Sequence, residues 1–153
     1  MIERFKRFRR LNAFGRSIAV EAAAGLLATW FGLRLIGFRR WERVLAVFAP
    51  SANASALASE RECALLIARL EAAAARNVLF QPSCLEQSLV LWWLLRRRGI
   101  AAEVRIGARK DSDRFEAHAW VEFDSQVLND ASADHRRFIP FEKPILSIEA
   151  RIE

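Results

Sequence analysis

The chain has 153 residues, of which 53% are hydrophobic and 27% are charged, and its formal net charge is +6. These values are typical of one folded domain and exclude an intrinsically disordered chain. The chain has only two cysteines, which excludes a disulfide framework and favours a reducing, cytoplasmic location.

The positive charge is concentrated in residues 1–50, which hold ten Lys or Arg residues against three acidic residues. Such a region could attract nucleic acid, anionic lipid or an acidic peptide, or could be a solvated helix face. Its apolar run over residues 22–33 has 12 residues, whereas a membrane-spanning helix needs about 20. We therefore expect a buried helix, or one that lies against a partner or a membrane surface, and no spanning segment.

Residues 4–47 predict two or three helices that are interrupted near Gly15, Gly32 and Gly37. The small and polar residues after Pro50 mark the best boundary in the chain. We therefore expect a basic helical docking region over residues 1–54 and a second region over residues 55–153. The next helix is predicted to begin at the capping box Ser59-Glu60-Arg61-Glu62 and to end near residue 76.

A second capping box, Ser83-Cys84-Leu85-Glu86, predicts a helix with Ser83 as its N-cap and Cys84 as its first residue. Three arginines at positions 96–98 complement the helix dipole, and Gly99 supplies the stop. This place at a helix end favours a structural role for the arginines over nucleic-acid binding. Apolar residues at helical spacing predict a buried stripe made of Leu85, Leu89, Trp92 and Trp93.

After this helix the hydrophobic period changes from that of a helix to that of a strand. Strands are predicted over residues 102–106 and 115–123, with a polar turn over residues 111–114 between them. A short turn leads into residues 126–130, and two further extended segments are predicted over residues 138–141 and 145–148. Helices followed by an antiparallel sheet indicate an α+β domain.

A cysteine, a histidine and a carboxylate occur in the order Cys84, His118 and Asp130, as in a cysteine nucleophile with its base and orienter. The first residue of a helix suits a thiolate, because the unpaired N–H groups and the dipole stabilise an anion. Cys63 lies in an apolar helical pattern and is expected to be a small buried hydrophobe. His135 is the rival base, but it lies in a charged segment, so His118 is favoured.

A two-residue turn at Asp124-Ser125 would pair Phe123 with Gln126 and place Asp130 one step out of register with His118. An ideal ladder would then point the last two side chains to different faces of the sheet. We therefore expect an irregularity in the backbone just before Asp130.

No metal or cofactor is expected. Neither the two cysteines nor the two histidines have the spacing of a structural zinc site. The sequence also lacks the glycine-rich motifs that bind nucleotide phosphates.

Residues 80–131 resemble the B2 leader peptidase of lasso-peptide biosynthesis, a transglutaminase-like branch of the papain-type cysteine peptidases. The turn at Asp124-Ser125 departs from the family, in which a glycine is common at this place. The blocks that carry the resemblance are Ser83-Cys84-Leu85 with Ser88-Leu89 and Trp92, Leu95-Arg96-Arg97-Arg98-Gly99-Ile100, Arg105-Ile106-Gly107, Ala117-His118-Ala119-Trp120-Val121-Glu122 and Leu128-Asn129-Asp130.

The resemblance implies a papain/transglutaminase-like core, in which the helix with the cysteine packs on a small antiparallel sheet with the histidine and the aspartate. It implies removal of the leader from a ribosomally made precursor peptide, which frees the core peptide for a separate ATP-using cyclase. Cys84 would be the nucleophile, His118 the general base and then acid, and Asp130 the orienter of the imidazole. The Cys84 backbone N–H would hold the oxyanion, with Gln81 and Trp120 as further candidates for oxyanion or substrate contacts.

The partners that the resemblance implies are the precursor leader, a small B1 leader-recognition protein and the lasso cyclase. The basic region of residues 1–54 would then dock one of these partners, and no nucleic acid is expected. Two alternatives stay open at this point. One is acyl transfer to an amine, or amide hydrolysis, on the same three residues. The other is a non-catalytic protein that binds nucleic acid or a membrane through its basic helices.

Overall fold

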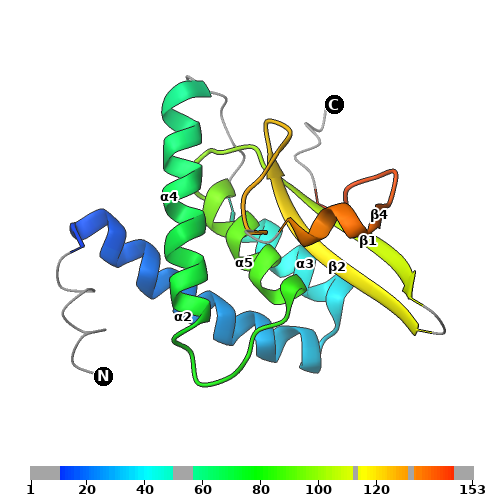
Figure 1. Ribbon diagram of the computed structural model, residues 1–153. Coiled ribbons are helices and arrows are strands. Elements are labelled where there is room, and N and C mark those ends of the chain that lie inside the picture. The colour runs from blue at the N-terminus through cyan, green and yellow to red at the C-terminus, as the bar shows by residue number, and fades with distance from the viewer. Residues whose placement is uncertain (1–10, 50–56, 112–113, 131–132, 147–153) are drawn as a thin grey trace, which may run out of the picture.

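The computed structural model describes residues 11–49, 57–111, 114–130 and 133–146. Within these ranges the first elements are the helices α2 (Ala13–Leu35), α3 (Phe38–Val47), α4 (Leu57–Ala75) and α5 (Cys84–Arg96) (Figure 1). They are followed by β1 (Glu103–Asp111), β2 (Arg114–Phe123), β3 (Gln126–Val127), the 3-10 helix η1 (Asp134–Arg137) and β4 (Ile139–Pro140). The predicted α+β class is thus confirmed. The predicted boundary after Pro50 and the basic residues of positions 1–10 lie outside the described residues.

Helix α2 runs without interruption through two of the glycines at which a break was predicted. Its N-cap is Asn12, whose side chain accepts a hydrogen bond of 2.8 Å from the Gly15 N–H. Gly32 lies inside the helix, and Trp41 of α3 packs so closely against it that a Cβ atom would lie 2.2 Å from the indole ring. The chain breaks only at Gly37, whose φ of 77° lies in the left-handed region that favours glycine. The predicted breaks at Gly15 and Gly32 were therefore wrong.

By length and composition α2 could cross a membrane, since it has 23 residues and its most apolar window has a mean hydropathy of 1.4. The helix extends the predicted apolar run across Glu21 and Arg34. The core helix of a soluble protein meets the same criteria, so this is weak evidence. Within this fold, α2 packs along α4 and α5.

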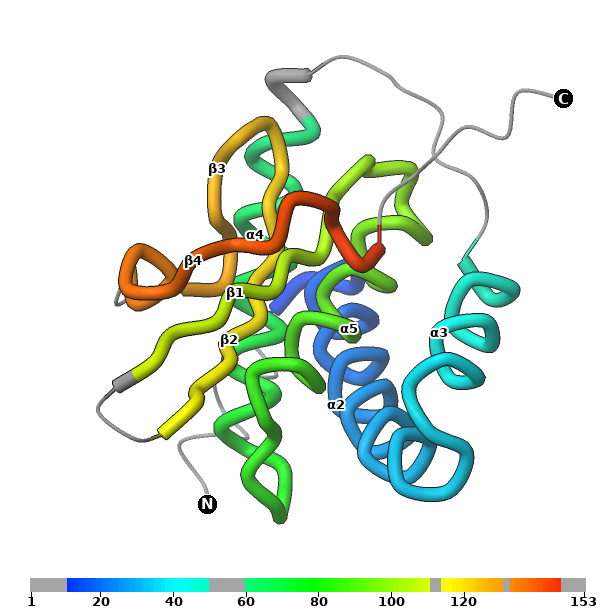
Figure 2. Tube along the Cα trace, turned by 90° about the vertical axis from the view of Figure 1, so that its right-hand side faces the viewer, coloured from blue at the N-terminus to red at the C-terminus, as the bar shows by residue number. Residues whose placement is uncertain are grey.

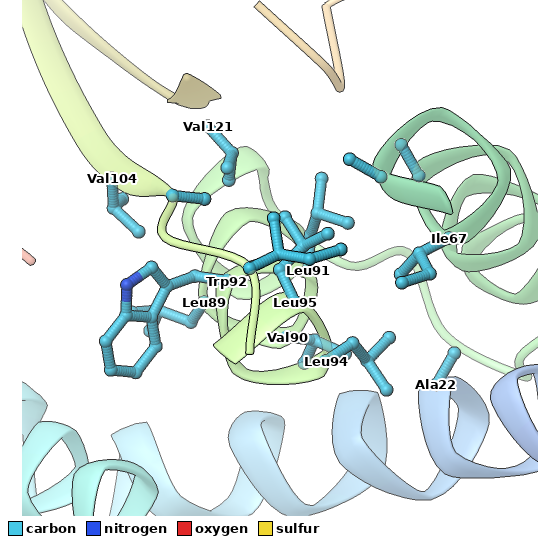
Figure 3. Close-up of a cluster of buried hydrophobic side chains, with 14 of the residues drawn as sticks. Ala22, Ile67, Leu89, Val90, Leu91, Trp92, Leu94, Leu95, Val104 and Val121 are labelled. Carbon is cyan, nitrogen blue, oxygen red and sulfur yellow. The ribbon is translucent and has the colours of Figure 1, made fainter. Parts of the chain in front are cut away.

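Helix α5 lies at the centre of the molecule, between β2 of the sheet on one side and α2 and α4 on the other (Figure 1 and Figure 2). This position explains why the helix is buried on more sides than the predicted single stripe. Its buried side chains include Val90, Leu91 and Leu94, whereas Leu85 and Trp93 from that stripe are only partly buried. Figure 3 shows side chains of α2, α4, α5 and the sheet meeting in one cluster. The two regions predicted from the sequence therefore share a single core.

Local signals fixed the ends of α5 as predicted. Ser83 accepts a hydrogen bond from the Glu86 N–H, and the Glu86 carboxylate accepts one from the Ser83 N–H, so the capping box is complete. At the other end Arg98 donates to the Leu94 carbonyl, and the chain turns at Gly99 with a φ of 79°. The α4 capping box was placed wrongly, because α4 begins at Leu57 and Ser59 lies inside it.

The sheet is antiparallel, with strand order β3-β2-β1-β4. Its centre is the long β1–β2 hairpin, which pairs residues 103–111 with residues 114–122. The first strand is thus longer than the predicted residues 102–106. The last extended segment also joins the sheet, because Leu146 forms a bridge with Val104. Residues 112–113 and 147–148, which were predicted as a turn and an extended segment, lie outside the described residues.

Candidate active site

Cys84 is the first residue of α5 and is partly buried. The first intrahelical acceptor is the Ser83 carbonyl, which binds the Gln87 N–H. Among the described residues, the backbone N–H of Cys84 donates no hydrogen bond, as is usual in the first turn of a helix. Cys84 therefore lies at the positive end of the helix dipole, and its own backbone N–H group is free to bind an oxyanion.

An ion pair fixes the start of α5 against α2. The Glu86 side chain is 4% exposed, and its Oε1 atom lies 2.8 Å from Nη1 of Arg34. The Arg34 guanidinium also lies over the Trp30 ring, 4.1 Å from its centroid. Because the same carboxylate completes the capping box, this pair helps to set where Cys84 lies relative to the core.

The turn that brings the chain back from β2 has the predicted register. Phe123 pairs with Gln126, and the two turn residues Asp124 and Ser125 have φ values of 49° and 60°. Positive φ at both central residues is the geometry of a type I′ turn, whose twist matches that of the flanking strands. The hairpin therefore forms without the glycine that is common in the resembling family.

The predicted irregularity before Asp130 is present and is made by Asn129. The ladder ends at β3, after which the Leu128 N–H still donates to the Val121 carbonyl at 2.9 Å. The Val121 N–H then donates to the side-chain oxygen of Asn129 at 2.8 Å, so a side chain replaces the next backbone partner. Because a side chain takes the place of the backbone carbonyl, the chain can leave the ladder here. Asp130 then lies on the side of the sheet on which His118 lies.

Asn129 also connects α5, which carries the cysteine, to β2, which carries the histidine. Its side-chain N–H group donates to the Ser88 hydroxyl at 3.0 Å, and Ser88 is fully buried. Ser88 lies one helical turn after Cys84 on the same face of α5. The face of α5 that carries Cys84 is therefore directed toward the segment that carries Asp130. The local sequence around Asn129 gives no signal of the contact with Ser88, which lies 41 positions away in the chain.

Asp130 lies between two histidines, and the structure brings together both candidate bases. Its Oδ2 atom is 3.7 Å from Nε2 of His118 and 2.8 Å from Nδ1 of His135. The same oxygen accepts the His135 backbone N–H at 2.5 Å. The Asp130 side chain is 5% exposed, and the two imidazoles are 22% and 21% exposed. Sequence reasoning favoured His118 as the partner of Asp130, but His135 makes the shorter contact.

The carboxylate of Asp130 is held in its ionised form. Burial by itself raises the pKa of Asp130, but hydrogen bonds from the His135 N–H, the His135 ring and the Asp134 N–H lower it, as does the nearby His118. The net effect is a pKa below the ordinary value of 3.8. Asp130 is therefore a stable negative charge beside His118, which is what orientation of an imidazolium requires.

His118 points Nε2 toward Asp130, and this nitrogen is buried without a hydrogen bond to any described residue. The ring lies between Trp120 and Phe138, with centroid distances of 6.0 Å and 5.3 Å. Neither histidine forms a hydrogen bond with the Cys84 thiol in the part of the chain that the structure describes. The Asp130–His118 half of the proposed triad is thus assembled, and Cys84 lies at the start of the helix packed on the same strand.

The two further candidates lie in different surroundings. Trp120 is 2% exposed, and its indole N–H already donates to Glu122 at 2.7 Å. Its ring packs against both imidazoles, so the structure gives it a supporting position beneath the histidines. Gln81 is exposed three residues before Cys84 and makes no side-chain hydrogen bond to the described residues.

Cys63 is partly buried against the core, and burial raises the pKa of its thiol above the ordinary value of 9.0. This agrees with a packing role and with an unreactive thiol. Within the described ranges, no group of three or more His, Cys, Asp or Glu side chains has an arrangement that could hold a metal ion.

Comparison with known families gives one match. Residues 25–143, more than three quarters of the chain, match the model of the transglutaminase-like superfamily. No curated protein and no solved structure matches the chain. The match covers α5, β2 and η1, which carry Cys84, His118 and His135, and the segment that carries Asp130. It supports a cysteine-type enzyme of the peptidase or acyltransferase kind. The chain belongs to the transglutaminase-like superfamily.

Proposed function

We propose that this protein is a cysteine peptidase that removes the leader from a lasso precursor peptide, with Cys84, His118 and Asp130 as its catalytic residues. The observation that carries the proposal is the ionised Asp130 carboxylate facing Nε2 of His118, on the strand against which the Cys84 helix packs. The resemblance of residues 80–131 to the B2 leader peptidase supplies the substrate class.

The proposed reaction follows from which nitrogen of His118 faces Asp130. Because Nε2 faces the carboxylate, Nδ1 is left to take the proton of the Cys84 thiol. The thiolate attacks the last carbonyl carbon of the leader, and the Cys84 N–H stabilises the oxyanion. The core peptide leaves as an amine that takes the proton from His118. Water then hydrolyses the leader thioester, with His118 again as the base.

An apolar cavity lined by α2, α3 and α5 supports docking of a partner on the amino-terminal helices. It has a volume of about 250 Å³. Exposed arginines at positions 39, 40 and 43 also lie on α3, although they do not line the cavity. We propose that this surface contacts the B1 recognition protein, the leader or the cyclase in the cytoplasm, and that it does not bind nucleic acid. The side chains that line the cavity include Ala24, Ala28, Val44, Phe48, Val90 and Trp93.

The test is cleavage of a lasso precursor by the purified protein together with its recognition partner. The parent protein and the Cys63→Ala control should release the core peptide, whereas Cys84→Ala should not. Circular dichroism would establish that Cys84→Ala is folded. Cleavage that survives Cys84→Ala would refute the proposal.

Mass spectrometry of the products also distinguishes the second reaction that the same residues permit. Hydrolysis adds water to the leader, whereas acyl transfer adds the mass of an amine. A leader product that carries an added amine in place of water would establish the acyl-transfer alternative.

A further inference from the structure

His135 binds the proposed catalytic carboxylate twice. Its ring nitrogen Nδ1 lies 2.8 Å from Oδ2 of Asp130, and its backbone N–H donates to the same oxygen. His118 approaches that oxygen only to 3.7 Å. Because an ionised carboxylate only accepts hydrogen bonds, the His135 ring must carry its proton on Nδ1 to make this contact.

Asp130 has no sheet partner among the residues that the structure describes. The ladder ends at β3, three residues earlier, and the chain then turns into η1. Ala133 occupies the left-handed region with a φ of 53°, and its N–H donates to the Asp130 carbonyl at 3.2 Å. The side-chain hydrogen bonds that position the carboxylate therefore come from the segment that begins η1.

We propose that His135 is a positioning residue that holds the Asp130 carboxylate against His118 and thereby makes the Cys84 thiol reactive. This inference rests on the proposed function, because it takes Cys84, His118 and Asp130 as the catalytic residues. In this proposal His135 acts through Asp130, and His118 is the histidine that exchanges a proton with the thiol.

The groups that face Asp130 are few, so the effect of His135 can be separated from that of its neighbours. The titratable or charged groups from the packed elements are His118 of β2, and Asp134 and His135 of η1. The other carboxylates on this face of β2 are engaged elsewhere: Glu116 pairs with Arg109, and Glu122 accepts hydrogen bonds from Trp120 and Arg105.

The test measures alkylation of Cys84 by iodoacetamide across pH, which needs no substrate. A Cys63→Ala background leaves one thiol in the chain. His135→Leu removes the ring donor. His135→Asn keeps it, because the asparagine amide nitrogen is attached at the same position as Nδ1. His118→Asn is the reference for loss of the base.

We expect His135→Leu to slow alkylation at pH 6 about tenfold, as loss of one hydrogen bond to a charged group implies. His135→Asn should stay within about twofold of the background protein, since it keeps a donor of the same reach. His118→Asn should abolish the alkylation at this pH. Thermal unfolding of each variant would show that these differences arise in folded protein.

The unmodified protein gives a second measurement, which holds even where a variant does not fold. The chain has two histidines, so a long-range ¹H–¹⁵N spectrum shows only two imidazoles. When its ring is neutral, His135 should carry its proton on Nδ1. A neutral His135 with its proton on Nε2 would overturn the inference.

The outcomes separate this inference from the proposed function. If His135→Leu reacts as fast as the background while His118→Asn does not, only the role of His135 is wrong. If His118→Asn has no effect and His135→Asn abolishes alkylation, His135 is the base and the inference fails. If neither His118→Asn nor Asp130→Asn changes the reaction, the proposed catalytic residues themselves are wrong.

Discussion

Glu71 gives a quantitative prediction about stability and pH. It lies on α4, it is fully buried, and neither carboxylate oxygen has a hydrogen-bond partner among the described residues. Burial raises the pKa of Glu71 from 4.5 to about 8, although the charge of Arg76 acts in the opposite direction. The side chain is therefore neutral in the folded protein at pH 7 and ionised in the unfolded chain.

The sign of the effect follows from where the proton is lost first. As the pH rises above 4.5 the unfolded chain releases the Glu71 proton while the folded protein keeps it to about pH 8, so rising pH favours unfolding. The free energy of unfolding should fall by about 1.4 kcal/mol per pH unit inside this window, and by roughly 2 kcal/mol between pH 6 and pH 8.

Other shifted groups act outside this window. The pKa values of Asp130 and Glu21 are lowered, so their contributions to the free energy of unfolding change at acidic pH, below the ordinary values of 3.8 and 4.5. The pKa of Cys63 is raised from 9.0, so its effect comes at alkaline pH. The part of the slope between pH 6 and pH 8 that disappears in Glu71→Gln is therefore the measure of Glu71.

Urea denaturation followed by tryptophan fluorescence at pH 6, 7 and 8 would measure the slope. Glu71→Gln should remove it, since the amide does not titrate. Glu71→Met should remove it and also raise the free energy of unfolding, because no unpaired polar atom stays buried. The exposed Glu62→Gln on the same helix is the matched control and should keep the slope. An unchanged slope in Glu71→Gln would refute the reasoning.

Two further substitutions test how the site is built. Asn129→Leu leaves the fully buried Ser88 hydroxyl and the Val121 N–H of β2 without their hydrogen bonds, so it should lower the free energy of unfolding by about 2–4 kcal/mol, measured by urea denaturation. Ser88→Ala should cost less, because it keeps the hydrogen bond from the Val121 N–H to Asn129. Equal losses in the two variants would contradict the bridging role of Asn129. Gly32→Ala would place a Cβ atom 2.2 Å from the Trp41 ring and should lower the free energy of unfolding by about 1–3 kcal/mol or more, whereas Gly25→Ala, with its nearest contact at 3.2 Å, should be tolerated much better. A Gly32→Ala protein as stable as Gly25→Ala would contradict that packing.

Local signals in the sequence predicted the parts of the site that depend on neighbouring residues. The capping box placed Cys84 at the first position of α5, and the turn at Asp124-Ser125 set the β2–β3 register. Each of these signals involves only four consecutive residues, so each can be recognised from the local sequence. The irregularity before Asp130 was predicted because a regular ladder would have pointed its side chain away from His118.

Contacts between distant segments could not be predicted from the sequence in this way. His135 lies in a charged segment that reads as a loop, and only the turn into η1 brings its ring to Asp130. The bond from Asn129 to Ser88 joins residues 41 positions apart. The role of Gly32, which is to leave room for the Trp41 ring, depends on how α2 and α3 pack together. In each case tertiary packing, and not local propensity, decided the result.

The central claim is that Cys84 forms a covalent intermediate with the leader. It is tested most directly by mixing the protein and its recognition partner with a precursor, quenching in acid after a short time, and measuring intact-protein and peptide masses. The account predicts a leader thioester on Cys84 that hydroxylamine removes and that is absent from Cys84→Ala. Release of the core peptide with no adduct at Cys84, and undiminished release by Cys84→Ala, would contradict it.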